Sequence, residues 1–250
     1  MAIFVVTSVS GAPGVTTTAL GLALQWGSRH VVLLDADPVG GAAILAGHFQ
    51  GRVVNPGTMV ELWMGHRQGR LAEALSESAL TLGEGIDFIP GAANAAQAST
   101  LAGLWPALSV ELKRMDALDV DVIVDYGRLG HTAAAEPLLR MADQVVVVMR
   151  SDLVSVAAVA AMPTLEAPVG LAVVGPGRPY SAAAITKTLQ LAVEFELPWA
   201  PKEAAVLSHG TPEATTRLGR RPRHVLAHRL VAAAEGLRWR AGLRLEELNA

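Results

Sequence analysis

Runs of apolar, mostly β-branched residues alternate along the chain with Ala- and Leu-rich segments of helical length. The apolar runs predict six strands, at residues 2–7, 30–35, 86–90, 120–125, 144–149 and 170–175. Because these runs are apolar on both faces, they are typical of parallel strands covered by helices on both sides. The segments between them predict helices at residues 16–27, 58–64, 69–80, 99–117, 132–141, 153–160, 182–196 and 224–238. We therefore predict an α/β fold with a doubly wound, mainly parallel sheet and helices on both faces, as one domain over residues 1–250.

A sheet of this kind binds ligands outside the carboxyl ends of its strands. The segments to search for a site are therefore residues 8–17, 35–41, 125–130 and 150–152, each of which follows a predicted strand. The first three carry residues with recognisable chemistry.

The first of these segments is a glycine-containing loop that leads into a helix. Gly11 and Gly14 allow the backbone to approach a phosphate closely, and the helix N-terminus adds positive potential there. The hydroxyl group of Thr16 is placed to ligate Mg²⁺, and Thr17 can cap the helix or contact a phosphate. The loop is therefore a candidate nucleotide-binding element.

Two features of the same loop disfavour phosphate binding. Pro13, which follows Ala12, has no N–H group to donate, and Val15 places an isopropyl group where a phosphate-binding loop carries lysine. The chain has 17 Arg but only three Lys, and its first 112 residues contain no lysine. A loop that merely connects strand to helix is the alternative that we favour slightly.

Carboxylates follow two further predicted strands. Asp35 and Asp37 lie in LLDADPVGG (33–41), and Asp125 ends the apolar run of DVIVDYGRLG (121–130). Such carboxylates suit a metal-facing or water-positioning role; alternatively, Asp35 and Asp37 cap a strand end and a helix. Arg128 can replace the missing positive charge or pair with Asp37 or Asp125, and we favour the pairing, because crowded carboxylates repel each other.

These segments resemble the MinD/ParA family of P-loop ATPases. The loop is similar to the family's deviant Walker A sequence, (T/S)-G-K-G-G-V-G-K-T-T-T, and Asp35, Asp37 and Pro38 are similar to its D-x-D-P-Q-G motif. The loop matches at Thr7, Ser8, Gly11, Gly14, Thr16, Thr17 and Thr18. It departs from the family at Ser10 and Val15, which stand where the family has its signature lysine and its phosphate-binding lysine.

The resemblance implies an ATP or ADP site with Mg²⁺. The nucleotide would contact the loop residues Gly11, Ala12, Pro13, Gly14, Val15, Thr16 and Thr17. Thr16, Asp35 and Asp125 would hold the metal, and Asp37 would be the catalytic residue that orients the attacking water. Gly175 stands where the family has the asparagine that reads adenine.

Loss of both lysines predicts a degenerate family member, a pseudo-ATPase that acts as a scaffold or spatial-positioning factor through protein partners. Localisation proteins of the TadZ/CpaE group are the nearest functional analogy. The alternative is a weak Mg-dependent ATPase with nucleotide-linked dimerisation, whose charge comes from Arg128 or from a partner subunit. A heterodimer with an active family member is a third reading.

Charge is concentrated near the end of the sequence. Residues 217–244 contain eight arginines and a single acidic residue, Glu235. One interpretation of these arginines is a face that binds nucleic acid or an anionic membrane. The alternative, which we favour, is a surface helix whose apolar stripe packs on the domain and whose arginines are solvated. The residues in question are Arg217, Arg220, Arg221, Arg223, Arg238 and Arg240.

The remaining composition narrows the function classes. The absence of cysteine excludes disulfides and thiolate metal sites. His224 and His228 lie one helical turn apart, a spacing that can hold a metal, but the arginines nearby favour a solvated basic face. Without a basic residue ahead of its first apolar run, the chain is expected to be cytoplasmic, with peripheral association at a membrane or nucleoid left open.

Overall fold

The computed structural model describes residues 2–27, 29–40, 43–54, 57–115, 119–211 and 224–248, the side chains of residues 243–248 excepted. Within them, eight strands form one sheet in the order β3-β4-β2-β5-β1-β6-β7-β8, and every neighbouring pair is parallel except β3 with β4. The strands are β1 (Ile3–Ser8), β2 (His30–Asp35), β3 (Leu80–Gly83), β4 (Ile86–Ile89), β5 (Val120–Arg128), β6 (Gln144–Arg150), β7 (Val169–Val174) and β8 (Val193–Leu197).

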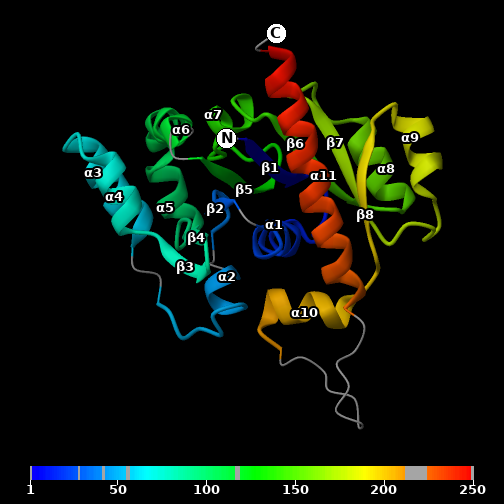
Figure 1. The fold of residues 1–250 in the computed structure, drawn as a ribbon, viewed down its shortest axis with the longest axis horizontal. Coiled ribbons are helices and arrows are strands. Elements are labelled where there is room, and N and C mark those ends of the chain that lie inside the picture. The colour runs from blue at the N-terminus through cyan, green and yellow to red at the C-terminus, as the bar shows by residue number, and fades with distance from the viewer. Residues whose placement is uncertain are drawn as a thin grey trace.

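Helices cover both faces of this sheet (Figure 1). The helices are α1 (Val15–Leu24), α2 (Ala43–Ala46), α3 (Thr58–Arg67), α4 (Leu71–Glu77), α5 (Ala95–Thr100), α6 (Trp105–Arg114), α7 (Glu136–Arg140), α8 (Leu153–Ala160), α9 (Ala182–Leu189), α10 (Pro201–His209) and α11 (Val225–Leu248), with a 3-10 turn, η1 (Ala102–Leu104). Successive side chains of a strand point to opposite faces, so Ile3 and Val5 enter one hydrophobic cluster and Phe4 and Val6 enter the other. The first cluster lies under α3, α4 and α6–α9, and the second under α1, α2 and α11.

The predicted fold class and all six predicted strands are confirmed. The sequence-based assignment missed the strands at the two edges of the sheet: β3 begins at the last residue of the predicted helix 69–80, and β8 lies mostly within the predicted helix 182–196. Residues 182–196 form α9 only as far as Leu189, because Gln190 adopts a left-handed φ of 55° that ends the helix. The following VEFEL segment alternates apolar and charged residues, as an edge strand does, and forms β8.

Helix α10 was also missed, because its Pro-rich start resembles a loop. Pro201 occupies the first turn, where a helix tolerates proline because the N–H group there has no intrahelical partner. Gly210 ends the helix in the left-handed conformation that favours glycine.

Asp121 lies near the amino end of β5, at the end of the strands opposite the predicted site, and fixes the start of the chain by hydrogen bonds. The Asp121 side chain is buried, and its two oxygens accept hydrogen bonds from Ala2 N and Trp26 Nε1, both at 2.9 Å. Arg29 Nε lies 3.2 Å from the same carboxylate and provides the opposite charge. The negative charge of the buried Asp121 is therefore balanced by Arg29, and both of its oxygens accept hydrogen bonds.

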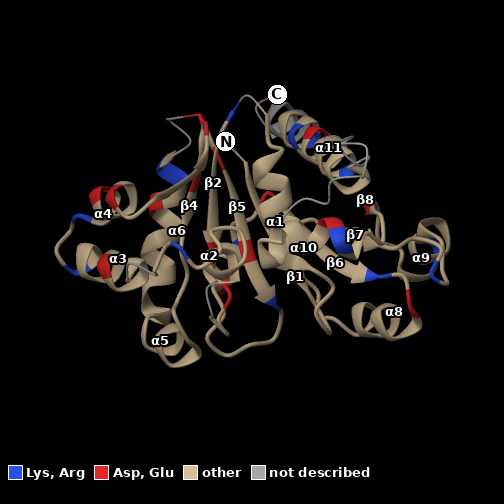
Figure 2. Cartoon of the chain, turned by 90° about the horizontal axis from the view of Figure 1, so that it is seen from below, with Lys and Arg blue, Asp and Glu red and all other residues tan. Residues whose placement is uncertain are grey.

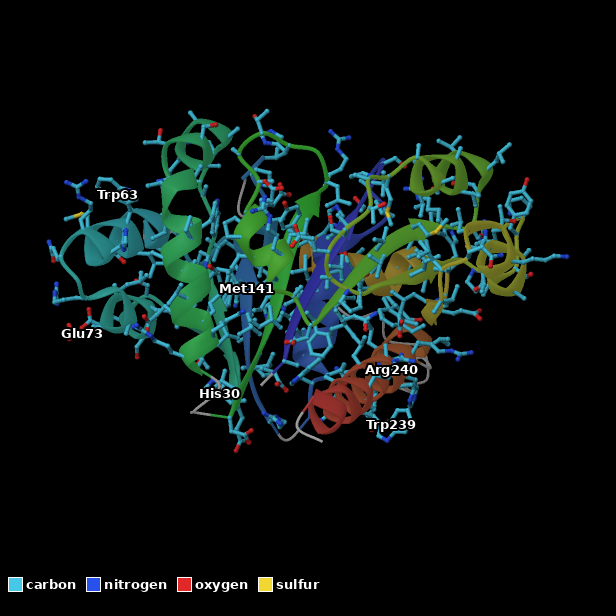
Figure 3. The ribbon with its side chains drawn as sticks, turned by 90° about the horizontal axis from the view of Figure 1, so that it is seen from above. His30, Trp63, Glu73, Met141, Trp239 and Arg240 are labelled. Atoms are coloured by element: carbon cyan, nitrogen blue, oxygen red, sulfur yellow. The ribbon has the colours of Figure 1, made fainter. Side chains whose placement is uncertain are left out.

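Helix α11 packs its apolar stripe against the sheet, as expected of a surface helix. Leu237 and Ala241 are buried in the same cluster as α1, whereas Trp239 is 67% exposed and extends from the outer side of the helix (Figure 3). None of the described helices combines the length and the apolarity that a bilayer span requires.

Two arginines predicted to face nucleic acid or membrane have partners within the protein instead. Arg240 forms an ion pair at 2.8 Å with Glu194 on β8, whose side chain is only 7% exposed. The guanidinium carbon of Arg238 lies 5.9 Å from the centre of the Trp26 ring. Arg240 therefore links α11 to β8 and Arg238 links it to Trp26, which follows α1, while their role in a nucleic-acid or membrane face stays a prediction. The other four, Arg217, Arg220, Arg221 and Arg223, lie outside the described residues.

Replacing Arg240 by alanine should lower the free energy of unfolding by about 2 kcal/mol, because Glu194 would remain as a buried charge without its partner. Arg229→Ala is the matched control on the exposed side of α11 and should change stability by less than about 0.5 kcal/mol. Urea unfolding followed by circular dichroism measures both values. Equal stabilities of the two variants would show that the ion pair does not anchor α11.

Candidate functional site

The glycine loop joins β1 to α1 at the carboxyl edge of the sheet. Gly11 has a φ of 64° and Gly14 a φ of 104°, and both values favour glycine because a Cβ would be strained there. Gly14 is the residue before α1, and its carbonyl oxygen accepts the hydrogen bond of Thr18 N at 2.8 Å. The N–H groups of Val15, Thr16 and Thr17 donate to no acceptor among the described residues. The first turn of α1 therefore presents free backbone donors, as an anion-binding loop does.

Val15 contributes no polar group to this loop. Its side chain is only 8% exposed and belongs to the hydrophobic cluster between the sheet, α1 and α11. Ser10 is half-buried and uncharged. The two positions at which the MinD/ParA family carries lysine therefore provide no positive charge.

The structure brings three of the predicted carboxylates together beside the loop. Asp35 and Asp125 are in-register neighbours on the parallel strands β2 and β5, and both side chains are buried. Figure 2 shows acidic positions among the central strands, with a basic position at the end of the β5 arrow. Thr16, from the first turn of α1, forms a side-chain hydrogen bond with Asp125. The predicted metal-binding group Thr16, Asp35 and Asp125 is thus one cluster.

Asp37 is the third carboxylate of this cluster and contacts Asp35, Val39 and Gly127. Its N–H group donates to Asp35 Oδ1 at 3.1 Å, and its own Oδ1 accepts from Val39 N at 2.9 Å. A Cβ at Gly127 would lie 2.5 Å from Asp37 Cγ, so the Asp37 carboxyl group packs directly on the Gly127 backbone. Gly127 is required both by this approach and by its φ of 66°.

Burial and mutual repulsion change the acidity of this cluster. Burial, together with the nearby Asp125 carboxylate, raises the pKa of Asp35 from 3.8 to about 8. Burial also raises the pKa of Asp125, to about 6, although hydrogen bonds from Thr16 and from Gly127 N oppose the change. In the part of the chain that the structure describes, no Lys or Arg forms an ion pair with these carboxylates.

The predicted ion pair between Arg128 and Asp37 or Asp125 is accordingly not formed. Arg128 is the last residue of β5 and is exposed, because the strand carries it beyond the buried carboxylates. Its proposed role as a substitute for the missing lysine stays a prediction.

Sequence analysis missed an arginine that does reach the loop. Arg150, the last residue of β6, donates through Nη2 to the carbonyl oxygen of Ala12 at 3.3 Å. Arg150 and Trp199 line a cavity of about 350 Å³ together with the loop residues Ala12, Pro13, Gly14 and Thr17. The signal in the sequence was the position of Arg150 directly after an apolar strand, in one of the four segments singled out above.

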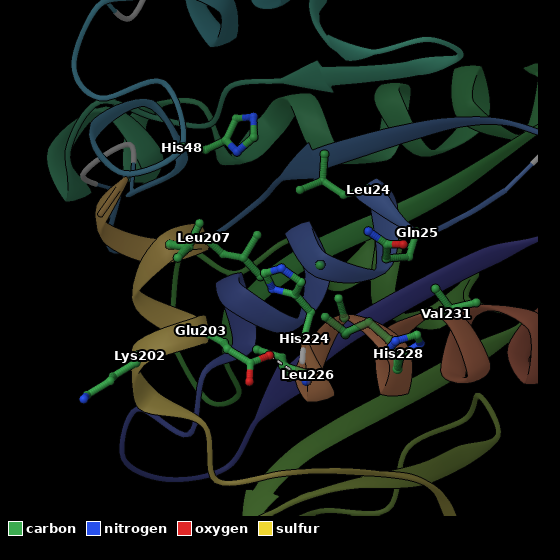
Figure 4. Close-up of a pocket in the computed structure, with 14 residues that line it drawn as sticks. Leu24, Gln25, His48, Lys202, Glu203, Leu207, His224, Leu226, His228 and Val231 are labelled. Carbon is green, nitrogen blue, oxygen red and sulfur yellow. Dashed lines mark hydrogen bonds between the residues drawn. The ribbon is translucent and has the colours of Figure 1, made fainter. Parts of the chain in front are cut away.

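A larger groove of about 720 Å³ lies elsewhere, between α1, α10 and α11 (Figure 4). Its walls are mainly apolar, and the Glu203 carboxylate there accepts a hydrogen bond from Leu226 N at 2.8 Å. His224 and His228 line this groove, but no group of three or more His, Cys, Asp or Glu among the described residues is arranged to hold a metal ion.

Comparison with solved structures identifies the fold. MinD from Pyrococcus horikoshii OT3, complexed with Mg-ADP, matches with a TM-score of 0.71 and 16% identity, over 97% of this chain and 98% of that one. MinD in the MinC:MinD complex of Aquifex aeolicus matches with a TM-score of 0.68 and 16% identity, over 95% of both chains. The chain has the MinD/ParA fold. An ATP complex of a Cyanothece McdA variant has the same fold, with a TM-score of 0.66, 19% identity and coverage of 95% and 96%. Neither the family models nor the curated proteins gave a match.

The oxygen atoms at this site of the MinD/ParA fold are of the kind that Mg²⁺ prefers, although Asp35, Asp37 and Asp125 do not form a group of three acidic ligands arranged to hold a metal ion. Mg²⁺ prefers oxygen ligands, and Thr16, Asp35 and Asp125 would offer a hydroxyl and two carboxylates. A bound cation would also relieve the repulsion between Asp35 and Asp125. The loop itself offers a phosphate only backbone N–H groups, because residues 10 and 15 are uncharged.

Asp35→Asn should stabilise the protein at neutral and higher pH. The pKa of Asp35 in the folded state lies above its ordinary value of 3.8, so folding binds a proton between about pH 4 and pH 8. The wild-type free energy of unfolding should consequently fall, relative to that of Asp35→Asn, as the pH rises through this range. At pH 8 the variant should be more stable by about 2 kcal/mol.

Urea unfolding at pH 5 and pH 8 measures this difference, and Asp121→Asn is the matched control. Asp121 is equally buried but has Arg29 as its partner, so its replacement should destabilise the protein at both pH values. If Asp35→Asn also destabilises the protein at both values, the Asp35 carboxylate is compensated after all.

Proposed function

We propose that this protein is a MinD/ParA-like pseudo-ATPase that acts as a scaffold or spatial-positioning factor through protein partners. The observation that carries the proposal is the commitment of Val15 to the hydrophobic core. Phosphoryl transfer depends on positive charge held against the phosphate oxygens that gain charge in the transition state. Neither residue 10 nor residue 15 supplies that charge, because serine and valine have uncharged side chains and Val15 is buried in the core.

The contacts of Asp37 are compatible with the same conclusion. An attacking water in such a site is oriented by a carboxylate, the role that the MinD/ParA resemblance assigns to Asp37. Here the Asp37 N–H group donates to the Asp35 carboxylate, and Asp37 Oδ1 accepts from Val39 N, so both hydrogen bonds join residues two positions apart. Such contacts keep the segment after β2 in its shape whether or not a nucleotide is hydrolysed.

Partner binding is consistent with the use of this fold elsewhere. MinD of Aquifex aeolicus forms a complex with MinC, so a protein with this fold can serve as a platform for a second protein. We propose that this chain works in the same manner in the cytoplasm, reaching a membrane or the nucleoid through its partner or through a homodimer or heterodimer.

The alternative function is a weak Mg-dependent ATPase with nucleotide-linked dimerisation. It is favoured by the cluster of Thr16, Asp35, Asp37 and Asp125, which retains the oxygen ligands for Mg²⁺. The ATP complex of McdA and the Mg-ADP complex of MinD show that proteins with this fold bind such ligands.

Phosphate release from Mg-ATP distinguishes the two functions. The purified wild-type protein and Asp37→Ala should release phosphate at the same background rate, because no water-positioning step exists for the variant to lose. A wild-type rate well above that of Asp37→Ala would refute the pseudo-ATPase and establish the weak ATPase.

Restoring the lysines tests why hydrolysis is absent. In Ser10→Lys/Val15→Lys, positive charge returns to a site that still holds its carboxylates, so phosphate release should rise at least about tenfold over the wild type. Adding Asp37→Ala to this variant should remove the gain. No gain would mean that the site lacks more than its lysines, and would also count against the weak ATPase.

A further inference from the structure

Three residues from separate parts of the chain form a cationic cluster beside the glycine loop. The guanidinium carbons of Arg150, at the end of β6, and of Arg178, in the segment after β7, lie 5.7 Å and 5.2 Å from the centre of the Trp199 ring. Neither arginine forms an ion pair with any described carboxylate. Two positive charges therefore lie next to each other, and Asp152, which lines the same cavity, accepts a hydrogen bond from Ser155 N at 2.8 Å and forms no ion pair with either arginine among the described residues.

The backbone holds this cluster in place. Ser151 Oγ donates to the carbonyl oxygen of Gly175 and accepts from Arg178 N at 3.1 Å, which ties the segment after β7 to the end of β6. A Cβ at Gly175 would lie 3.3 Å from Arg178 Cδ and 3.4 Å from Trp199 Cβ, so glycine lets both side chains pack there. The backbone around Arg150 and Arg178 is thus set before any ligand arrives, and Arg150 Nη2 is further held by its hydrogen bond to the Ala12 carbonyl oxygen.

The cluster and the glycine loop face the same space. Arg150 and Trp199 line both the 350 Å³ cavity beside the loop and a neighbouring cavity of about 190 Å³, which also contains Arg178. On the loop side, the N–H groups of Val15, Thr16 and Thr17 have no acceptor among the described residues. Guanidinium groups and free backbone N–H groups are the donors that phosphate oxygens prefer.

We propose that Arg150, assisted by Arg178, supplies the positive charge that residues 10 and 15 lack, and that the loop binds the polyphosphate group of its ligand without selecting a base. The proposal deepens the proposed function, since it gives a non-hydrolysing protein a ligand that can control partner binding. It differs from the earlier prediction for Arg128, which does not line either cavity.

The lack of base selection follows from the residues that line the cavity beside the loop; the smaller cavity contains one acidic residue, Asp152, whose carboxylate already accepts from Ser155 N at the start of α8. A base edge is read by side-chain amides or carboxylates, yet the cavity beside the loop is lined by no Asn, Gln, Asp or Glu among the described residues. The Trp199 indole, 46% exposed, can stack on any base, because every base has a π face. Affinity should therefore come from the phosphates.

Calorimetric titration of the full chain with sodium pyrophosphate, ATP, GTP and adenosine, each with Mg²⁺, tests this inference. Pyrophosphate, ATP and GTP should all bind, with ATP and GTP within about threefold of each other, and adenosine should give no binding. Absence of pyrophosphate and ATP binding at millimolar concentration would overturn the proposal, and so would a clear preference for one base.

Variants identify the source of the charge. Arg150→Ala should weaken pyrophosphate binding at least about tenfold, Arg178→Ala by about threefold, and Arg150→Lys should retain part of the affinity. Arg67→Ala is the matched control, because Arg67 also lies over an indole, that of Trp63 at 5.3 Å, but lines neither cavity. Circular dichroism melting shows whether each variant is folded. If Arg150→Ala does not fold, Arg150→Lys still tests the role of Arg150.

Wild-type affinity in folded Arg150→Ala or Arg150→Lys/Arg178→Ala would refute the assignment of the charge. Phosphate release measured on the same samples keeps this inference separate from the proposed function. Hydrolysis by the wild type together with loss of binding in Arg150→Ala would refute the pseudo-ATPase and leave the arginine site standing. Absence of both binding and hydrolysis in the wild type would refute the arginine site and leave the pseudo-ATPase standing.

Discussion

The in-register parallel pairing of β2 with β5, and of β5 with β1, is the constraint on which the site depends. It places Asp35 opposite Asp125, and brings the glycine loop after β1 to the same edge of the sheet. Because the strands are covered on both faces, the carboxylates at their ends are buried rather than solvated. The pairing that builds the core therefore also creates a cluster of carboxylates whose charge is unfavourable unless a proton or a cation is bound.

Positive charge around this edge is distributed differently from what the loop sequence alone would predict. Of the two loop positions that lack lysine, residue 15 is also the first residue of α1, and its valine side chain enters the core. The cationic groups come instead from the ends of β6 and β7, through Arg150 and Arg178 held against Trp199. A site of this kind can retain an anion after losing the charges that accelerate its hydrolysis, because binding and transition-state stabilisation need charge at different positions.

The arginines of α11 illustrate how burial changes the meaning of a charged segment. In the sequence, Arg238 and Arg240 belong to an arginine-rich stretch that is typical of a surface for anionic polymers or lipids. In the fold, Glu194 on β8 and Trp26 after α1 lie against the same helix and engage both side chains. Composition reports how much charge a segment carries, but the neighbouring elements decide how much of it is available to a partner.

The sequence by itself determined the fold class, the six central strands and the grouping of Thr16, Asp35, Asp37 and Asp125. These follow from local signals, since continuous apolar runs mark buried strands and parallel strands deliver the residues after them to one edge. Only the tertiary structure decided that β8 is an edge strand, that Arg240 is an anchor and that Arg150, Arg178 and Trp199 meet beside the glycine loop. Those contacts join residues far apart in the chain, and no local pattern encodes which side chains will be neighbours once the sheet is assembled.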